Sequence, residues 1–146
     1  MLYVNVTKKY AEAQNSINKS RQIVMLYDGL IKIINQAMEA IKNNDIQGRY
    51  NLLEKACLVV NGLQDSLDFT QGGDIATLLD DYYFSIYMRI VNVNNDNNAK
   101  VLENVLEELA MMRDAWQDVD AQMAKGGAEL EMTADSASQV GVEYDA

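Results

Sequence analysis

Proline is absent from this chain of 146 residues, and so is histidine. Proline is the strongest breaker of helices, so its absence leaves every long segment able to remain helical. The absence of histidine excludes the systems in which a histidine activates a serine or cysteine nucleophile, and also the Glu-x-x-His ligands of di-iron helical bundles. We therefore expect a protein that is not an enzyme and that needs neither a cofactor nor a metal.

Cysteine, long apolar runs and positive charge are also scarce. Cys57 is the only cysteine, so no internal disulfide can form, which suits a reducing cytoplasm. There is no run of about 18 apolar residues, and the segment Met1–Thr7 lacks the basic flank of a secretory signal. The net charge of -10 argues against binding to nucleic acid, whose phosphates attract basic surfaces. These features predict a cytoplasmic protein with no membrane span.

Apolar residues are abundant, at 49% of the chain, which predicts a folded domain with its own core. In four segments they recur every three or four residues, as on one face of a helix. The predicted helices run from after Ser20 to about Asn43, from about Ile46 to Phe69, between Asp74 and Asn92, and from about Ala99 to Met123. Ser20, Asp45 and Asp74 are the predicted N-caps, and the stretch Thr70–Asp74, with its two glycines, is the predicted break between the second and third helices. The stretch Asn92–Asn98, rich in asparagine and aspartate, is a predicted turn before the fourth helix.

The core positions predicted from this periodicity are Ile23, Leu26, Tyr27, Leu30, Ile31, Ile34, Met38 and Ile41 in the first helix; Tyr50, Leu53, Ala56, Cys57, Val60, Leu63 and Leu67 in the second; Ile75, Leu78, Leu79, Tyr82, Tyr83, Ile86, Tyr87 and Ile90 in the third; and Leu102, Val105, Leu106, Leu109, Met112, Trp116 and Val119 in the fourth. Helices of about 20 residues are about 30 Å long, and short polar links make them fold back on one another. The sequence thus predicts an all-α, antiparallel up-down four-helix bundle over residues 20–124. An N-terminal arm at 1–19 and a disordered acidic tail at 125–146 flank the predicted bundle.

Three stretches within this helical plan, in the same order, carry a family resemblance. They are Ile23-Val24-Met25-Leu26-Tyr27-Asp28-Gly29-Leu30-Ile31, preceded by Tyr10 and Asn15; Leu67-Asp68-Phe69-Thr70-Gln71-Gly72-Gly73-Asp74-Ile75-Ala76, continued by Leu79, Tyr83 and Arg89; and Val105-Leu106 with Leu109, Arg113 and Trp116. Together they resemble the signature of the FliS family, the bacterial flagellin-specific export chaperones.

The resemblance implies a cytoplasmic chaperone that binds the C-terminal segment of flagellin and keeps the subunit monomeric. It also implies delivery to the flagellar type III export apparatus, with export-gate components or other flagellar regulators as further partners. A segment destined for the filament core is apolar on one face, and a groove that accepts a helix can shield it. An acidic chaperone stays soluble while it exposes apolar area.

The candidate partner-binding residues are Tyr10, Ile17, Leu26, Tyr27, Tyr83 and Tyr87. Tyrosine favours interfaces because its ring buries area while its hydroxyl remains hydrated. We expect a client groove bordered by Leu26 and Tyr27, covered in the free protein by an arm that Tyr10 anchors and that flagellin displaces. Core packing is the alternative role for Leu26 and Tyr27.

Two other classes of function remain open at this stage. A structural bundle that only self-assembles would form a stable oligomer indifferent to flagellin. An enzyme that uses carboxylates alone would have to employ Asp80, Asp81 or the pair Glu107-Glu108, which are better interpreted as solvated helix faces.

Overall fold

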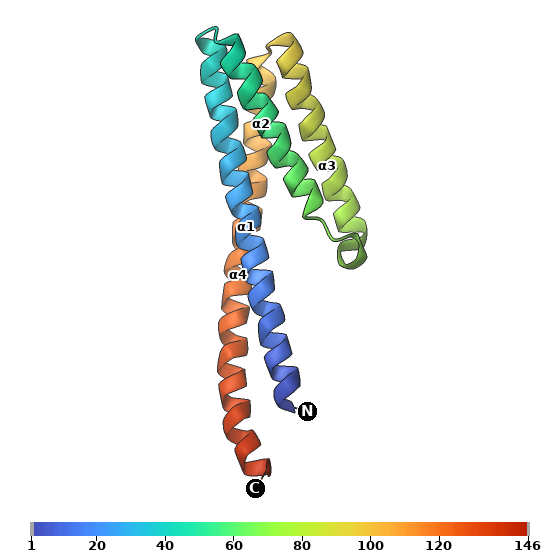
Figure 1. The fold of residues 1–146 in the computed structure, drawn as a ribbon, viewed down its shortest axis with the longest axis vertical. Helices are drawn as coiled ribbons and strands as arrows, with labels where there is room; N and C mark the ends of the chain where they lie inside the picture. Colours follow the sequence, from blue (N-terminus) through green and yellow to red (C-terminus); the bar gives the residue numbers. More distant parts are fainter. Residues whose placement is uncertain (1, 146) are drawn as a thin grey trace. The chain divides into compact units, whose positions relative to one another are not determined.

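The computed structural model describes the main chain of residues 2–145 and the side chains of residues 19–126. Over that main chain there are four helices and no strand, with α1 at Leu2–Lys42, α2 at Ile46–Asp65, α3 at Phe69–Asp96 and α4 at Ala99–Asp145 (Figure 1). The predicted all-helical fold is confirmed. The chain divides into two compact units, one of residues Met25–Arg113 and one of Met1–Val24 with Asp114–Ala146.

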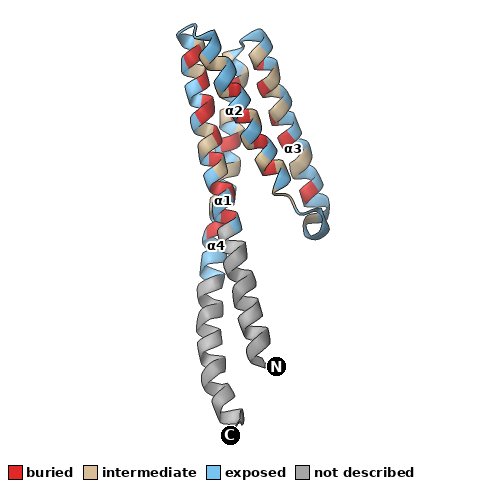
Figure 2. Cartoon of the chain, in the orientation of Figure 1, coloured by how far each residue is buried: buried red, intermediate tan, exposed pale blue. Residues whose placement is uncertain are grey.

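The larger unit has an apolar core in which each helix contributes one stripe at helical spacing (Figure 2). Its almost fully buried members are Tyr27, Leu30, Ile34 and Ala37 on α1; Leu53, Ala56, Val60 and Leu63 on α2; Tyr83, Ile86, Ile90 and Val93 on α3; and Leu102, Val105 and Leu109 on α4. Each fully buried aliphatic or aromatic side chain contributes about 1.5–3 kcal/mol relative to an exposed one. Most of these residues belong to the predicted stripes.

The N-cap of α2 is Asp45, as predicted. Its carboxylate accepts a hydrogen bond from the Gly48 main-chain N–H at 2.9 Å, which satisfies one of the free donors of the first turn. A Cβ atom on residue 48 would lie 2.2 Å from the Asp45 Oδ2 atom, so this arrangement requires glycine there.

The connection between α2 and α3 differs from the prediction. α2 ends at Asp65 rather than Phe69, and Asp68 rather than Asp74 caps α3, accepting from the N–H groups of residues 70 and 71 at 3.0 and 3.1 Å. The two glycines lie inside α3, where Gly73 has φ 51° and ψ -124° and produces a kink. A left-handed φ is readily adopted only by glycine, so the glycine signal marked a kink instead of a loop.

Three predicted core positions are exposed instead. Tyr50 is 46% exposed, and Ile75 and Leu78 are each 68% exposed. Ile75 and Leu78 follow the Gly73 kink, and Ala76, seven residues before Tyr83, is buried in their place. The kink changes which positions of α3 face the core, and a spacing pattern that is continued across the kink therefore selects the wrong positions.

The predicted turn at residues 92–98 is also shorter in the structure. α3 continues to Asp96 and buries Val93, so that only Asn97 and Asn98 separate it from α4. Asn97 adopts a left-handed conformation with φ 60° and ends the helix. Asparagine tolerates this conformation better than most residues do. The asparagine-rich composition therefore correctly indicated a turn here but overestimated the length of that turn.

In the smaller unit, Ser20 does not begin a helix as predicted, because α1 runs through it. Its buried hydroxyl donates a hydrogen bond to Asp120 Oδ1 at 2.9 Å, and Arg21 Nε lies 3.9 Å from the other Asp120 oxygen. The hydroxyl of a serine inside a helix can thus bind a residue that is distant in the sequence instead of capping the helix. Apart from Lys19, Lys125 and Gly126, the predicted arm and tail lie outside the residues whose side chains are described, and both stay predictions. No helix in the described part of the chain combines the length and apolarity needed to cross a membrane.

Candidate functional site: a groove between α2 and α3

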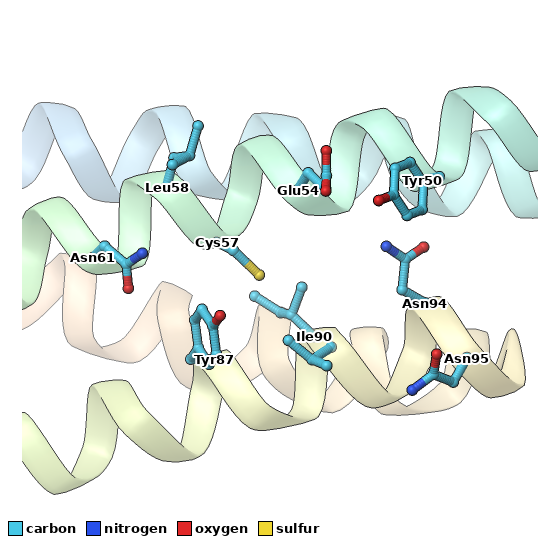
Figure 3. Close-up of a pocket in the computed structure, with 10 residues that line it drawn as sticks. Tyr50, Glu54, Cys57, Leu58, Asn61, Tyr87, Ile90, Asn94 and Asn95 are labelled. Carbon is cyan, nitrogen blue, oxygen red and sulfur yellow. The ribbon is translucent and has the colours of Figure 1, made fainter.

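A groove of about 460 Å³ lies between α2 and α3 in the larger unit (Figure 3). Its lining residues are Tyr50, Glu54, Cys57, Leu58 and Asn61 from α2, and Tyr87, Ile90, Val91, Asn94 and Asn95 from α3. On each helix they recur every three or four residues, so one face of α2 and one face of α3 form the two walls. The volume is within the range of specific binding sites in proteins.

The walls of the groove present apolar area to solvent. Leu58 is 70% exposed and Tyr50 is 46% exposed, whereas Ile90 is fully buried between the helices. Phe84 and Met88, 58% and 40% exposed, precede Tyr87 and Val91 on the same side of α3. Removing such side chains from water would be favourable, so this surface is suited to bind an apolar partner.

The described lining of the groove includes one charged side chain, that of Glu54. Glu54 is the only acidic residue among the described residues of the lining, and these include neither lysine nor arginine. Its hydrogen bond and negative charge raise the pKa of the Tyr50 hydroxyl, and burial together with that charge raises the pKa of the Cys57 thiol. Glu54 is thus the charged side chain of the described lining, while the guanidinium of Arg49, on α2, donates to the main-chain oxygen of Asn94 at 3.1 Å.

Asn94 adds an unusual feature to this surface. Its side chain points from α3 toward Tyr50 on α2 (Figure 3), and its Oδ1 atom is buried without a hydrogen-bond partner among the described residues. Buried acceptors are normally paired, because an unmade hydrogen bond is costly.

The four predicted site residues whose side chains are described do not lie on one surface. Tyr87 lines the groove, and Leu26 is half-buried on α1. Tyr27 and Tyr83 are 0% and 2% exposed and belong to the core, where the Tyr27 hydroxyl donates to the Tyr83 hydroxyl at 3.0 Å.

The predicted lid residues Tyr10 and Ile17 lie outside the residues whose side chains are described. Their displacement by a client stays a prediction, as does the binding role of the whole predicted set.

Sequence reasoning missed Leu58 and Asn94. Leu58 stands beside the buried stripe of α2, and the apolar run Cys57-Leu58-Val59-Val60 is wider than one core face needs. That excess was the available signal. Asn94 was assigned to a turn because of the neighbouring asparagines, and no local pattern places it opposite α2.

The carboxylates considered for an enzyme have other roles. Asp80 accepts a hydrogen bond from Gln64 at 3.3 Å, and Glu108 pairs with Arg89. Asp81 and Glu107 are exposed. No cluster of three or more side chains suited to a metal ion occurs in the described residues.

Comparison with known proteins gives consistent matches. The profile of the family described as "Flagellar protein FliS" matches residues 2–123. The "Flagellar secretion chaperone FliS" of Salmonella typhimurium is 30% identical over 118 residues, which cover 77% of this chain and 87% of the relative. The "Flagellar secretion chaperone FliSB" of Pseudomonas aeruginosa is 31% identical over 109 residues, covering 74% and 86%. The Campylobacter jejuni "Flagellar secretion chaperone FliS" is 26% identical over 111 residues, covering 75% and 87%.

Proposed function

Because this chain belongs to the FliS family of flagellar secretion chaperones, we propose that it binds the C-terminal segment of flagellin in the cytoplasm. There it prevents premature polymerisation and delivers the subunit to the flagellar type III export apparatus. The observation that carries the proposal is the apolar groove between α2 and α3, with Leu58 70% exposed, on a protein of net charge -10. Export-gate components or other flagellar regulators are the further proposed partners.

Physical chemistry supports this pairing of surface and client. A segment that later packs in a filament is apolar on one face and self-associates when it is free. A helix-in-groove interface shields such a face, and the negative charge of the chaperone keeps it soluble while apolar area is exposed. The work is binding rather than catalysis, which agrees with the chaperones to which the chain is similar.

The proposal includes an antiparallel up-down arrangement of the four helices. Contacts between α2 and α3 support it, because Arg49 near the start of α2 donates to Asn97 at the end of α3 at 2.7 Å. Gln64 at the end of α2 donates to Asp80 of α3 at 3.3 Å. Residue numbers thus rise along one helix as they fall along the other.

Within the proposed site, Tyr87 and Leu26 contact the client directly. Tyr27 and Tyr83 contribute through the core that holds α1 against α3, since both are buried. Tyr10 and Ile17 are the proposed anchors of the displaceable arm.

The test is calorimetric titration of the chaperone with monomeric flagellin and with flagellin that lacks its C-terminal segment. We expect a stoichiometric complex with the intact protein and at least a tenfold weaker one with the truncated protein, a loss of about 1.4 kcal/mol or more. Sedimentation of the chaperone alone is the companion measurement. A stable oligomer that ignores both forms of flagellin would support the self-assembling structural bundle instead.

A further inference from the structure

We infer that Arg49 is a positioning residue for client binding. From α2 it caps the end of α3 and, together with a second polar contact at the other end of the helix pair, it fixes the distance between the two walls of the groove. The inference rests on the proposed function, in which this groove receives the client. It assigns a role to a residue outside the described lining of the groove.

The guanidinium of Arg49 reaches from the first turn of α2 to the last turn of α3. Its Nη1 atom donates to the side-chain oxygen of Asn97 at 2.7 Å, and its Nη2 atom donates to the main-chain oxygen of Asn94 at 3.1 Å. Asn94 is among the last four residues of α3, whose carbonyl groups have no N–H partner within the helix. Basic side chains often bond such carbonyls. Here the donor belongs to another helix, so one residue both caps α3 and ties it to α2.

A second polar contact links the two helices at the opposite end. Gln64 of α2 donates from Nε2 to Asp80 Oδ1 of α3 at 3.3 Å. All described lining residues of α2 lie between Arg49 and Gln64, and all those of α3 lie between Asp80 and Asn97. We call the contact of Arg49 with Asn94 and Asn97 the Arg49 clasp. This clasp and the Gln64–Asp80 contact therefore bracket the groove.

Packing beside Arg49 is incomplete, so the hydrogen bonds have a role of their own. A cavity of about 140 Å³ is lined by Arg49 and Asn97 together with residues of the turn between α1 and α2. The Nε atom of Arg49 is buried without a partner among the described residues, which lowers stability. An apolar side chain of similar length would leave no unpaired donor there. Arginine at this position thus suits the placement of α3 better than it suits stability alone.

The clasp affects binding because it organises the groove in advance. A client needs both walls at one separation, and the free energy needed to order a loose wall is subtracted from the affinity. Asn94 and Asn95 line the groove and lie in the turn that Arg49 caps, so fraying of this turn would disturb the wall itself. Loss of the clasp should therefore weaken binding more than it lowers stability.

The decisive variant breaks the clasp without weakening the end of the helix. Asn97 has a left-handed φ of 60°, which glycine adopts more readily than asparagine does. In Asn97→Gly this gain offsets the loss of one exposed hydrogen bond, so the urea midpoint should change little. Binding of a fluorescein-labelled peptide of the flagellin C-terminal segment, measured by anisotropy, should weaken by about fivefold.

Asn44→Gly is the matched control. Asn44 has a φ of 55° in the turn between α1 and α2, but among the described residues no hydrogen bond joins it to Arg49, and it is not a described lining residue of the groove. Its replacement should change peptide binding by less than about twofold. Equal effects of the two glycine variants, or normal binding by Asn97→Gly, would overturn the inference.

A double-mutant cycle tests whether Arg49 and Asn97 act as one unit. Arg49→Met keeps a side chain of similar length and removes the donors, so stability should change little while peptide binding weakens by about fivefold or more. Arg49→Met/Asn97→Gly should bind like Arg49→Met, because both changes break the same contact. Fully additive losses would show that the two residues act separately and would contradict the clasp.

Cys57 gives a readout that needs no client. It is half-buried, lines the groove, and lies eight residues after Arg49 and seven before Gln64. Separation of the walls should raise the rate of its alkylation by iodoacetamide in the free protein by about threefold in Arg49→Met and Asn97→Gly, with no change in Asn44→Gly. Unchanged rates in both clasp variants would mean that Arg49 does not hold the walls together, and the inference would fail.

The outcomes separate this inference from the proposed function. If the wild-type protein does not bind the flagellin peptide, the proposed function fails and the role of Arg49 in client binding fails with it. If the wild-type protein binds and both clasp variants bind equally well, only the inference fails. A urea midpoint that falls in proportion to the loss of binding in every clasp variant would indicate a merely structural role and would also overturn it.

Discussion

The hydroxyl of Tyr27 on α1 donates a hydrogen bond to the hydroxyl of Tyr83 on α3 at 3.0 Å, inside a core where the two residues are 0% and 2% exposed. The ring centroids lie 6.4 Å apart at a tilt of 53°, a favourable arrangement for two aromatic rings. This polar contact links α1 to α3 through two residues that are 56 positions apart in the sequence. A hydrogen-bonded polar pair in an apolar core favours the alignment of the two helices that brings its members together over alignments that separate them.

A double-mutant cycle tests the energy of this contact. Tyr27→Phe and Tyr83→Phe should each lower the free energy of unfolding by about 1 kcal/mol, because each removes one partner of a buried hydrogen bond. The double variant should lose less free energy of unfolding than the sum of the two single losses, because it leaves no buried hydroxyl without its partner. Urea denaturation gives all four values, and strictly additive losses would contradict a direct contact.

Tyr82, next to this pair, is predicted to behave in the opposite way. Its hydroxyl is buried without a hydrogen-bond partner among the described residues, although its ring lies 5.6 Å from that of Tyr83. Tyr82→Phe keeps the ring contact and removes the unsatisfied hydroxyl, so the free energy of unfolding at pH 7 should rise by about 1 kcal/mol. Tyr83→Phe is the matched control, and a loss of stability in Tyr82→Phe would show that the hydroxyl has a partner.

Tyr82 also predicts a pH dependence at alkaline pH. Burial, and then the negative charge of Glu108, raises the pKa of its hydroxyl well above the usual 10.0. A group with a raised folded-state pKa contributes its stability fully below the unfolded pKa and loses it as pH rises toward the folded value. The free energy of unfolding should therefore fall above about pH 10, and it should fall less steeply in Tyr82→Phe. Urea denaturation of both proteins between about pH 8 and 11 measures the difference, and parallel curves would exclude Tyr82 as its source.

The sequence predicted the part of the fold that depends on local periodicity. Leu30, Leu53 and Leu102 were placed in the core because the spacing of apolar residues along one helix determines which face is buried. Ile75 and Leu78 were misplaced because Gly73 resets the helical phase before Tyr83.

The groove required information that no single helix contains. Asn94 and Glu54 are 40 positions apart, and only the packing of α3 against α2 brings them into one surface. For the same reason Ser20, a good N-cap by type, proved to be a buried partner of Asp120. Local patterns indicated which residues were apolar or polar, whereas tertiary contacts determined the use of each one.

The cap of α2 gives a prediction about two residues that depend on each other. Asp45→Ala should cost about 1 kcal/mol through loss of the hydrogen bond to the Gly48 N–H. Gly48→Ala should cost at least as much, although alanine favours helices by about 1 kcal/mol over glycine, because the new Cβ would lie 2.2 Å from the Asp45 carboxylate. In Asp45→Ala/Gly48→Ala the clash is gone and the propensity gain remains, so the double variant should be more stable than either single one. Thermal melts followed by circular dichroism decide this order.

Two leucines that were both predicted to be buried test the orientation of α4 about its axis. Both Leu106 and Leu109 were predicted to face the interior, but Leu109 is 0% exposed while Leu106 is only half-buried. Leu109→Ala should lower the free energy of unfolding by about 2–5 kcal/mol, because it loses the buried methyl groups and leaves a cavity that the core fills only in part. Leu106→Ala should cost only about 1 kcal/mol, since part of its apolar area is already in water and its neighbours at the surface can relax. Urea denaturation with unchanged slopes would assign the difference to the folded state. Equal losses in the two variants would mean that α4 is rotated from the orientation in which Leu102, Val105 and Leu109 form its buried stripe.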